Sequence, residues 1–325
     1  MTQTQGKPMV FAVTGPTATG KTELGVRLAK EFDGEIVSCD SMQVYRGLPI
    51  GTAQPDAQER QGIAHHMIGV LPVTEDCSVS RYVALAAGVM EEIRQRGKLP
   101  ILVGGTGLYA RALLLGTDLS ADGEEKVLRA RLLVAAEREG SKVLHERLAR
   151  LDPLAAEGIH PNNVKRVVRA LAYCERTGTR FSGKNQGWQG EAGYRYRMLS
   201  LSYEDRSVLY GRIEERVDRM MAGGLLEEAE GLYRITRSCR HLPTAAQAIG
   251  YKELFPYFDG ECSLETAVGK LKQASRRYAK RQMTWFRREP NCVIHSLDQD
   301  ADRNGALARA GELIREMAPA AGETH

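Results

Sequence analysis

Short apolar runs alternate with helical patterns in the N-terminal part of the chain. Met9–Thr14 is an apolar, β-branched run, and Glu23–Phe32 carries large apolar residues at helical spacing. Two further apolar runs, Ile36–Cys39 and Ile101–Val103, lie on either side of a helical pattern over Tyr82–Gln95. This alternation predicts an α/β fold with a parallel sheet, whose functional loops lie at the C-terminal ends of the strands.

The pattern changes at about Asp118. Glu124–Glu139, Val143–Leu151 and Asn163–Arg176 are charged, amphipathic helical segments, and strand patterns are absent between them. The stretch Gly178–Gly193 is rich in Gly, Ser, Asn and Gln and is predicted to be a loop. We therefore expect an all-helical insertion within the α/β core.

A further strand pattern at Tyr196–Leu201 returns the chain to the core. Helical patterns then continue from Val208 almost to Glu289, and the tail beyond Met317 is expected to be disordered. The predicted division is a core of residues 1–117 and 198–318, a helical insertion of residues 118–197 and a tail of residues 319–325.

The composition is typical of a soluble globular protein. The 325 residues are 42% hydrophobic and 26% charged, which is enough apolar material for a full core. Met1–Lys7 lacks the apolar run of a signal peptide, and no apolar stretch approaches the roughly 20 residues that span a bilayer. We expect a cytoplasmic protein with no membrane partner. The net charge of +4 is too small to identify a partner by itself.

The spacing of the cysteines argues against a zinc site or a disulfide framework. No CxxC pair and no Cys/His cluster at metal-ligand spacing occurs, so reduced structural thiols are expected. The six cysteines are Cys39, Cys77, Cys174, Cys239, Cys262 and Cys292.

A glycine-rich loop follows the first predicted strand. Residues 15–22 match GxxxxGK[ST] at every fixed position and lie between a strand and a helix, as this P-loop motif requires. In that geometry backbone N–H groups face an anion, Lys21 neutralises phosphate oxygens and Thr22 reaches a magnesium ion. The loop consists of Gly15, Pro16, Thr17, Ala18, Thr19, Gly20, Lys21 and Thr22.

A P-loop holds a polyphosphate but does not determine which bond is broken. Nucleoside triphosphatases usually have a second apolar strand ending in an Asp that organises magnesium and water. Here Ile101–Val103 is followed by Gly104–Gly107, and the only strand-terminal carboxylate in the first half of the chain is Asp40. Asp40 is therefore either a residue with a different chemical role or a cap of the turn that follows it.

Basic residues are concentrated near the C-terminus. Between Leu264 and Glu289 there are eight basic residues against two acidic ones. Leu264, Leu271, Tyr278 and Trp285 recur every seventh residue, so this stripe is predicted to pack on the core while the basic side chains face outward. The basic face is either a solvated surface or a contact surface for nucleic-acid phosphates.

A second basic cluster, Lys165, Arg166 and Arg169, lies on one side of a predicted helix in the insertion. Two such faces on separate parts of the chain could grip one strand of nucleic acid. Aromatic residues such as Tyr278 and Trp285 could stack on bases, but at this spacing core packing is the commoner role.

Eight blocks of sequence carry a family resemblance. They are Gly15–Thr22, Asp40–Arg46, Gly51–Ala53, His65–His66, Leu102–Tyr109, His160–Asn163, Gln247–Lys252 and Arg276–Arg287. In this order and spacing they resemble the bacterial tRNA dimethylallyltransferase family, over most of the chain. The resemblance implies a P-loop NTPase-like core with an inserted, mobile helical domain, and a tRNA anticodon stem-loop held between them. It also implies the substrates dimethylallyl diphosphate and the N6 amine of adenine 37.

The resemblance also implies roles for individual residues. Thr17–Thr22 would hold the diphosphate with Mg²⁺, to which Thr22 would be the protein ligand, and Arg216 would contact the diphosphate. Asp40 would be the general base, and Thr106 would line the channel in which the flipped adenine meets the allyl carbon. The target adenine would be contacted by Asp40, Ser41, Met42 and Gln43.

Further tRNA contacts are implied on both predicted domains. In the insertion they are Arg129, Lys165, Arg166, Val167, Val168 and Arg169. In the core they are Thr106, Gln247, Ala248, Ile249, Gly250, Tyr251, Lys252, Ser275, Arg276, Arg277, Tyr278, Ala279, Lys280, Arg281 and Gln282.

Some positions depart from the family pattern. Members commonly have Lys where Gln54 stands and Asp where Gly69 stands, and the linker Lys184–Gly193, which contains Trp188, does not match. The two histidines of the fourth block are expected to be structural, because the chemistry already has a candidate base.

Two other classes of protein fit part of the sequence. One is a P-loop kinase of a small metabolite or nucleotide, which needs no cationic C-terminal helix. The other is an RNA-binding NTPase that performs no modification. Neither class explains Asp40 and the Gly104–Tyr109 loop together. We expect the protein to be a monomer.

Overall fold

The computed structural model describes residues 7–115, 123–186, 193–239, 241–298 and 304–317. The chain divides into a core unit of residues 1–114 and 193–325 and a helical unit of residues 115–192. The predicted tail and Trp188 lie outside the described residues. The strand that returns to the core, predicted over Tyr196–Leu201, spans Arg195–Ser202 and so extends one residue further at each end.

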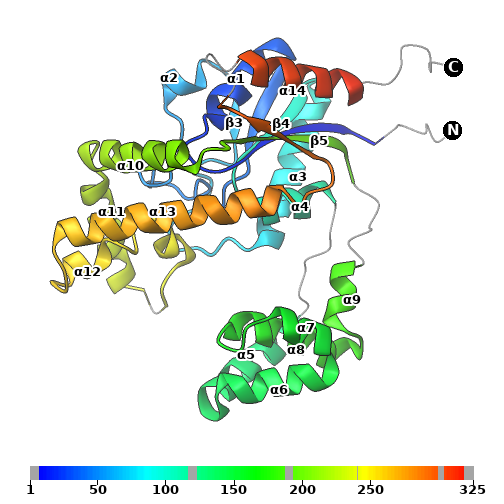
Figure 1. Cartoon of the computed structure of the whole chain (residues 1–325), viewed down its shortest axis with the longest axis vertical. Helices are drawn as coiled ribbons and strands as arrows, with labels where there is room; N and C mark the ends of the chain where they lie inside the picture. The colour runs from blue at the N-terminus through cyan, green and yellow to red at the C-terminus, as the bar shows by residue number, and fades with distance from the viewer. Residues whose placement is uncertain (1–6, 116–122, 187–192, 240, 299–303, 318–325) are drawn as a thin grey trace, which may run out of the picture. The chain divides into compact units, whose positions relative to one another are not determined.

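Six parallel strands in the described part of the core unit form one sheet, in the order β3-β2-β4-β1-β5-β6 (Figure 1). In the register of this sheet, Phe11 of β1 lies opposite Ile101 of β4 and Arg197 of β5. The strands are β1 (Met9–Thr14), β2 (Gly34–Ser38), β3 (His65–His66), β4 (Leu99–Val103), β5 (Arg195–Ser202) and β6 (Cys292–Ser296).

The central strands place three predicted site segments at one edge of the sheet. β4 pairs with β2 on one side and with β1 on the other. The P-loop follows β1, the turn beginning at Asp40 follows β2, and the Gly104–Gly107 loop follows β4. Because parallel strands all end on the same side, these three segments meet there.

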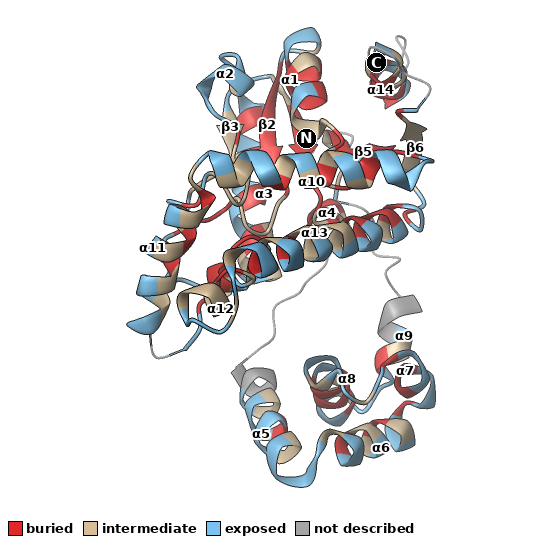
Figure 2. Cartoon of the chain, turned by 60° about the vertical axis from the view of Figure 1, so that its left-hand side comes forward, coloured by how far each residue is buried: buried red, intermediate tan, exposed pale blue. Residues whose placement is uncertain are grey.

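Helices cover the sheet, and its central strands are therefore apolar throughout. Val10–Val13 are fully buried, and Figure 2 shows buried positions along the strands and on the inner sides of the helices. α1 packs on the sheet and against α14, and α3 packs on the sheet and against α4. The core-unit helices are α1 (Lys21–Glu31), α2 (Ala57–Arg60), α3 (Val79–Gln95), α4 (Gly107–Leu114), α10 (Arg206–Ala222), α11 (Leu225–Arg237), η1 (Thr244–Gln247), α12 (Phe255–Phe258), α13 (Leu264–Phe286) and α14 (Asn304–Met317). Among the described residues, no helix is both long and apolar enough to cross a membrane.

Several elements of the core unit were not predicted. β3 consists of two half-buried histidines and β6 is half exposed, so neither shows an apolar run. α14 buries Leu313 and Ile314 against α1 and β5. The predicted continuous helical region after Val208 is interrupted, because α11 ends at Arg237 and a largely irregular segment with η1 leads to α12.

The predicted loop Gly178–Gly193 contains a short helix, α9 (Phe181–Gln186). Asp152 holds its start, since Oδ2 accepts from Ser182 N at 2.6 Å and Oδ1 from Ser182 Oγ at 2.7 Å. Phe181 packs edge-on against Tyr173, with ring centroids 5.7 Å apart. The contacts with Asp152 and Tyr173 thus stabilise a helix in a segment whose composition favours a loop.

The helical unit has a hydrophobic core of its own. Leu144 and Leu148 pack with Leu171 and with Val167 and Val168. The resemblance implies tRNA contacts for both valines, but their side chains are buried and cannot reach a nucleic acid. The remaining helices of this unit are α5 (Gly123–Glu139), α6 (Ser141–Leu151), α7 (Pro153–Gly158) and α8 (Val164–Thr177).

The carboxylate of Glu35, in β2, has three nitrogen partners from basic side chains. It is 5% exposed and accepts from Arg96 Nη2 at 2.7 Å, with His66 Nε2 at 2.7 Å and Lys98 Nζ at 3.6 Å. Hydrogen bonding from Arg96 lowers the pKa of Glu35 to about 2; burial opposes this shift and the His66 contact adds to it.

We predict that Glu35→Gln lowers the free energy of unfolding by about 1–3 kcal/mol at neutral pH, the usual cost of disrupting a buried hydrogen-bonded charge. Because the folded-state pKa lies below the ordinary value, the stabilisation is complete above pH 4.5 and is lost as the pH falls toward about 2. Urea unfolding curves of wild type and variant should converge over this range. Glu75→Gln, which removes an exposed ion pair with Arg81, is the control and should cost about 0–1 kcal/mol. A difference independent of pH would contradict the prediction.

Candidate active site

The P-loop leads directly into α1 and is held together by hydrogen bonds within the loop. Thr19 Oγ1 donates to Pro16 O at 2.9 Å, and Lys21 Nζ donates to the same carbonyl at 2.5 Å. Gly20 is the N-cap of α1 and supplies no side-chain acceptor, so the first N–H groups of the helix are available to an anion. Arg212 Nε donates to Ala18 O at 3.1 Å and ties the loop to α10.

Asp40 lies close enough to Lys21 and Arg216 for its charge to affect the pKa values of both cations. Burial and then the charge of Arg216 lower the pKa of Lys21 to about 7, whereas the charge of Asp40 opposes the shift. Burial also lowers the pKa of Arg216, and Asp40 again opposes it. Two cations therefore share the site with one carboxylate, and a bound anion would relieve the repulsion between the cations.

Asp40 caps the turn after β2 with one of its two oxygens. Oδ1 accepts from Met42 N at 2.8 Å and from Gln43 N at 3.3 Å. No described residue hydrogen-bonds to Oδ2. The turn-capping role and a chemical role are therefore compatible, because they use different oxygens of the same carboxylate.

Thr106 lies directly against the Asp40 turn. Its Oγ1 accepts from Ser41 N at 3.1 Å, and its own N–H donates to Cys39 O at 3.2 Å. Gly104 permits this contact, since a Cβ there would lie 2.1 Å from the Cys39 carbonyl oxygen. Burial and the charge of Asp40 raise the pKa of Tyr278, which α13 brings close to Thr106. The structure thus brings the three predicted catalytic residues Asp40, Thr106 and Arg216 to one site with Lys21.

Gln282 of α13 links the P-loop to the loop after β4. Oε1 accepts from Thr17 N at 3.1 Å, and Nε2 donates to Gly105 O at 3.0 Å. The resemblance implies a tRNA contact for Gln282, but the side chain is buried and both polar ends are engaged inside the protein. This role was not predicted from the sequence; the available sign was an amide on a helix face that is otherwise apolar, with Ala279, Met283 and Phe286.

Gln43 is also engaged inside the protein. Nε2 donates to Thr52 O at 3.2 Å and Ala53 O at 2.8 Å, and Oε1 accepts from Ser38 Oγ at 2.7 Å. An adenine contact through this amide would require these bonds to break. Gln54, where family members commonly have Lys, donates from Nε2 to two carbonyls of the same turn at 3.1 and 2.7 Å. The neutral amide of Gln54 therefore anchors the Asp40 turn at the position where family members commonly have Lys.

The buried face of α13 differs from the predicted stripe. Leu271 is buried, whereas Leu264, Tyr278 and Trp285 are only half-buried. The buried residues follow the 3.6-residue period of the helix rather than a seven-residue repeat. They are Ala267, Leu271, Ala279, Gln282, Met283 and Phe286.

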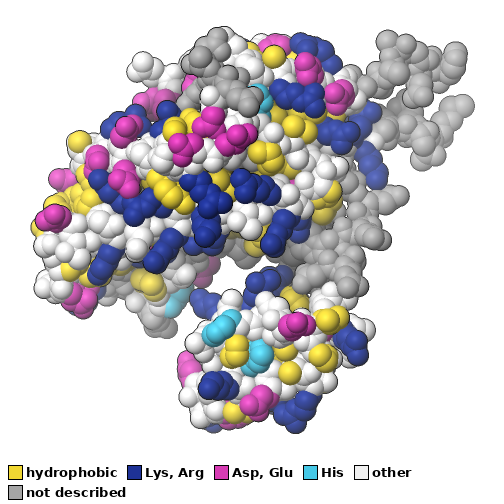
Figure 3. Space-filling model, viewed as in Figure 1, with side chains coloured by type: hydrophobic (Ala, Val, Ile, Leu, Met, Phe, Trp, Pro, Cys, Tyr) yellow, Lys and Arg dark blue, Asp and Glu magenta, His cyan; other side chains and the backbone are white. Residues whose placement is uncertain are grey.

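Exposed cations follow α13 across the core unit (Figure 3). Arg277, Lys280 and Arg281 are exposed, whereas Arg276 is half-buried and paired with Glu214. On α8 of the helical unit Lys165, Arg166 and Arg169 are exposed. Of the other implied contacts, Gln247 and Lys252 are exposed, Arg129, Ile249 and Ser275 are half-buried, and Ala248, Gly250, Tyr251 and Ala279 are buried.

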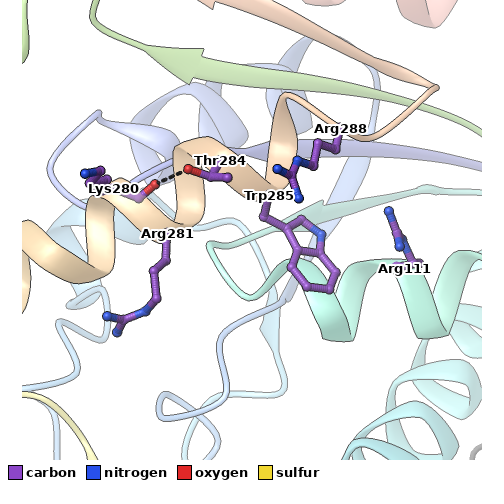
Figure 4. A pocket seen from close by; sticks show the side chains of 6 residues that line it. All are labelled: Arg111, Lys280, Arg281, Thr284, Trp285 and Arg288. Carbon is purple, nitrogen blue, oxygen red and sulfur yellow. Dashed lines mark hydrogen bonds between the residues drawn. The ribbon is translucent and has the colours of Figure 1, made fainter. Parts of the chain in front are cut away.

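A cavity of about 460 Å³ lies between α4 and the end of α13. Figure 4 shows Arg111 and Arg288 on either side of the Trp285 indole, with Arg281 pointing away from it. The Arg111 guanidinium lies 5.1 Å from the Trp285 ring centroid and pairs with the buried carboxylate of Glu289. The remaining lining residues are Lys280 and Thr284. Trp285 therefore belongs to the cationic surface as well as to the packing of α13.

The charges at the P-loop edge define the class of protein. Two cations at an open helix N-terminus are typical of a phosphate-binding site, and the carboxylate beside them has one oxygen to which no described residue hydrogen-bonds. The core unit thus has the fold and the charges of a P-loop enzyme. The IPP transferase family model matches residues 43–289, and the isopentenyl transferase model matches residues 8–75. The chain belongs to the tRNA dimethylallyltransferase family.

Named relatives agree with this assignment. The tRNA dimethylallyltransferases of Geobacillus kaustophilus and Bacillus subtilis are 48% and 46% identical to the chain, over 86% of it and 88% of each relative. The crystal structure of a tRNA isopentenylpyrophosphate transferase from Bacillus halodurans is 41% identical, with a TM-score of 0.71, and covers 96% of this chain and 98% of that one.

A eukaryotic dimethylallyltransferase, described as acting on tRNA, is 29% identical with a TM-score of 0.80, over 97% of this chain and 81% of that one. The predicted fold class, a P-loop NTPase-like parallel sheet core with an inserted helical domain, is confirmed by the sheet and by these neighbours.

We predict that binding of inorganic diphosphate makes Lys21 take up a proton above neutral pH. The pKa of Lys21 is lowered to about 7 by burial and then by the charge of Arg216, so above that pH much of the protein carries a neutral lysine. A bound anion favours the ammonium form, so the dissociation constant should rise with pH above about 7. Calorimetry in buffers of different ionisation enthalpy measures the proton uptake.

Lys21→Arg is the control for this experiment, since a guanidinium stays charged throughout this pH range. Diphosphate itself also titrates, and the difference between wild type and variant isolates the contribution of Lys21. Equal proton uptake by the two proteins would contradict the prediction.

Proposed function

We propose that the protein transfers a dimethylallyl group from dimethylallyl diphosphate to the N6 amine of adenine 37 in the anticodon loop of tRNA, and releases diphosphate. The observation that carries the proposal is the placement of Asp40 beside Lys21 and Arg216, with one carboxylate oxygen available. A cationic site for a leaving diphosphate and a base for an incoming amine are the two requirements of this reaction.

The P-loop side of the site serves the leaving group. As the bond between the allyl carbon and oxygen breaks, negative charge grows on the diphosphate. Lys21, Arg216 and the N–H groups at the start of α1 stabilise that charge, and they are in place before the reaction begins.

The Asp40 side of the site serves the nucleophile. An exocyclic adenine amine is a weak nucleophile because its lone pair is delocalised into the ring, and it must lose a proton on alkylation. As nitrogen bonds to the allyl carbon, Oδ2 of Asp40 accepts that proton. Thr106, bonded to the neighbouring Ser41 backbone, lines the space where the two substrates meet.

The P-loop donor set fits Mg²⁺ when the diphosphate is bound. No group of three or more His, Cys, Asp or Glu among the described residues could hold a metal ion by itself. Mg²⁺ commonly takes few protein ligands and completes its shell with substrate phosphates and water. Thr22, half-buried at the start of α1, would hold the ion, which would supply further neutralisation of the diphosphate.

Two basic surfaces support tRNA as the second substrate. Exposed cations occur on α13 in the core unit and on α8 in the helical unit. Such surfaces bind a phosphate backbone, and the eukaryotic structural neighbour is described as acting on tRNA. A small-molecule kinase has no need of either surface.

Incubation with tRNA and dimethylallyl diphosphate, followed by digestion to nucleosides and mass spectrometry, tests the function. The expected result is a dimethylallyl mass gain on adenosine. Phosphate transfer from ATP to a small molecule, with adenosine unmodified, would contradict the proposal.

Asp40→Asn should lower the single-turnover rate by about 10²- to 10⁴-fold, the usual effect of losing a general base. Asparagine keeps an oxygen for the N–H groups of Met42 and Gln43, so the turn and the affinities for both substrates should be retained. A variant with more than about a tenth of the wild-type rate would show that Asp40 is not the base. Loss of diphosphate affinity and of its magnesium dependence would instead indicate a metal-binding role.

Arg277→Ala combined with Lys280→Ala should weaken binding of any tRNA and flatten the plot of log affinity against log salt by about one unit per lost phosphate contact. Both residues are exposed on α13. Lys270→Ala, on the same helix outside the implied contact segment, is the control and should leave the slope unchanged. An unchanged slope in the double variant would count against this surface.

A further inference from the structure

One carboxylate of α11 anchors the segment that follows the Asp40 turn. Glu228 Oε2 accepts from Ile50 N at 2.9 Å, and Oε1 accepts from Gly51 N at 2.8 Å and from the Tyr251 hydroxyl at 2.7 Å. Three donors from two distant parts of the chain therefore fix the orientation of this half-buried carboxylate.

Tyr251 packs tightly into the anchor. Its side chain is fully buried, and burial together with Glu228 raises the pKa of its hydroxyl, which therefore remains a donor at physiological pH. The ring lies against Gly51, where a Cβ would be 2.5 Å from the phenol oxygen. The resemblance implies a tRNA contact for Tyr251, but the buried side chain instead contacts Glu228.

The anchored segment in turn holds the Asp40 turn. The carbonyls of Thr52 and Ala53, directly after Gly51, accept both donors of the Gln43 amide. Gln43 N donates to Oδ1 of Asp40 at 3.3 Å. A continuous series of hydrogen bonds and backbone thus runs from Glu228 to the carboxylate of Asp40.

We propose that Glu228 is a positioning residue for the transfer reaction. By fixing residues 50–53 it holds Gln43, and through Gln43 it keeps Asp40 turned so that Oδ2 faces the adenine amine. The proposal rests on the proposed function, because it assigns Asp40 as the base. None of the hydrogen bonds in this series involves the P-loop, so diphosphate binding should not depend on Glu228.

Glu228→Gln keeps the size of the side chain but replaces one acceptor oxygen with an NH₂ group that faces an N–H donor. The single-turnover rate at saturating substrates should fall by about 10- to 100-fold, the scale expected when a catalytic group is misplaced. The dissociation constant of diphosphate should stay near the wild-type value. Glu230→Gln, on the same helix with a surface ion pair to Arg234, is the matched control and should react at the wild-type rate.

A double variant distinguishes positioning of the base from a general loss of stability. In the Asp40→Asn background, Glu228→Gln should lower the rate no further, because there is no base left to position. The proposal would be overturned if the rate losses of the two single variants multiply in the double variant. It would also be overturned if Glu228→Gln reacts at the wild-type rate or fails to bind diphosphate. If the wild-type protein leaves adenosine unmodified, the proposed function fails as well. Wild-type transfer with an unaffected Glu228→Gln variant overturns only the role of Glu228.

Discussion

The close contact between the loops that follow β2 and β4 is the constraint on which the site depends. It exists because Gly104 has no side chain, which lets the Cys39 carbonyl approach and accept the N–H of Thr106. Gln282 fastens the adjoining glycine to the P-loop. Three loops from three strands therefore form one continuous surface, with its donors fixed before a substrate arrives, as electrostatic catalysis requires.

The electrostatics of the site follow from this packing. Burial disfavours the charged forms of both Lys21 and Arg216, the charge of Arg216 adds to this effect at Lys21, and Asp40 offsets part of the cost at both. A diphosphate would complete the balance of charge. The Asp40 carboxylate therefore offsets the charge of the two cations in addition to its part in the proposed reaction.

The parts of the structure encoded in neighbouring residues could be predicted from the sequence. The P-loop, the alternation of β1, α1 and β2 and the position of Asp40 at a strand end all depend on residues within one turn or one strand. The roles of Gln282, Gln43 and Glu228 could not be predicted, because their partners lie far along the chain or because the side chain folds back into the protein. β3 and β6 were not predicted for a related reason. Each is a strand because it pairs with a neighbouring strand, and neither shows an apolar run in the sequence.

Helix α13 carries two features that are usually found on separate elements. On its inner face the Gln282 amide oxygen accepts a hydrogen bond from Thr17 N of the P-loop, and its outer face presents Arg277 and Lys280 to solvent. If a polyanion bound to the outer face displaced α13, the backbone N–H of Thr17 would move with Gln282. Thermodynamic linkage would then require reciprocity, so that whatever factor the nucleic acid added to diphosphate affinity, diphosphate would add to nucleic-acid affinity. The helix would in that case couple the two substrate sites.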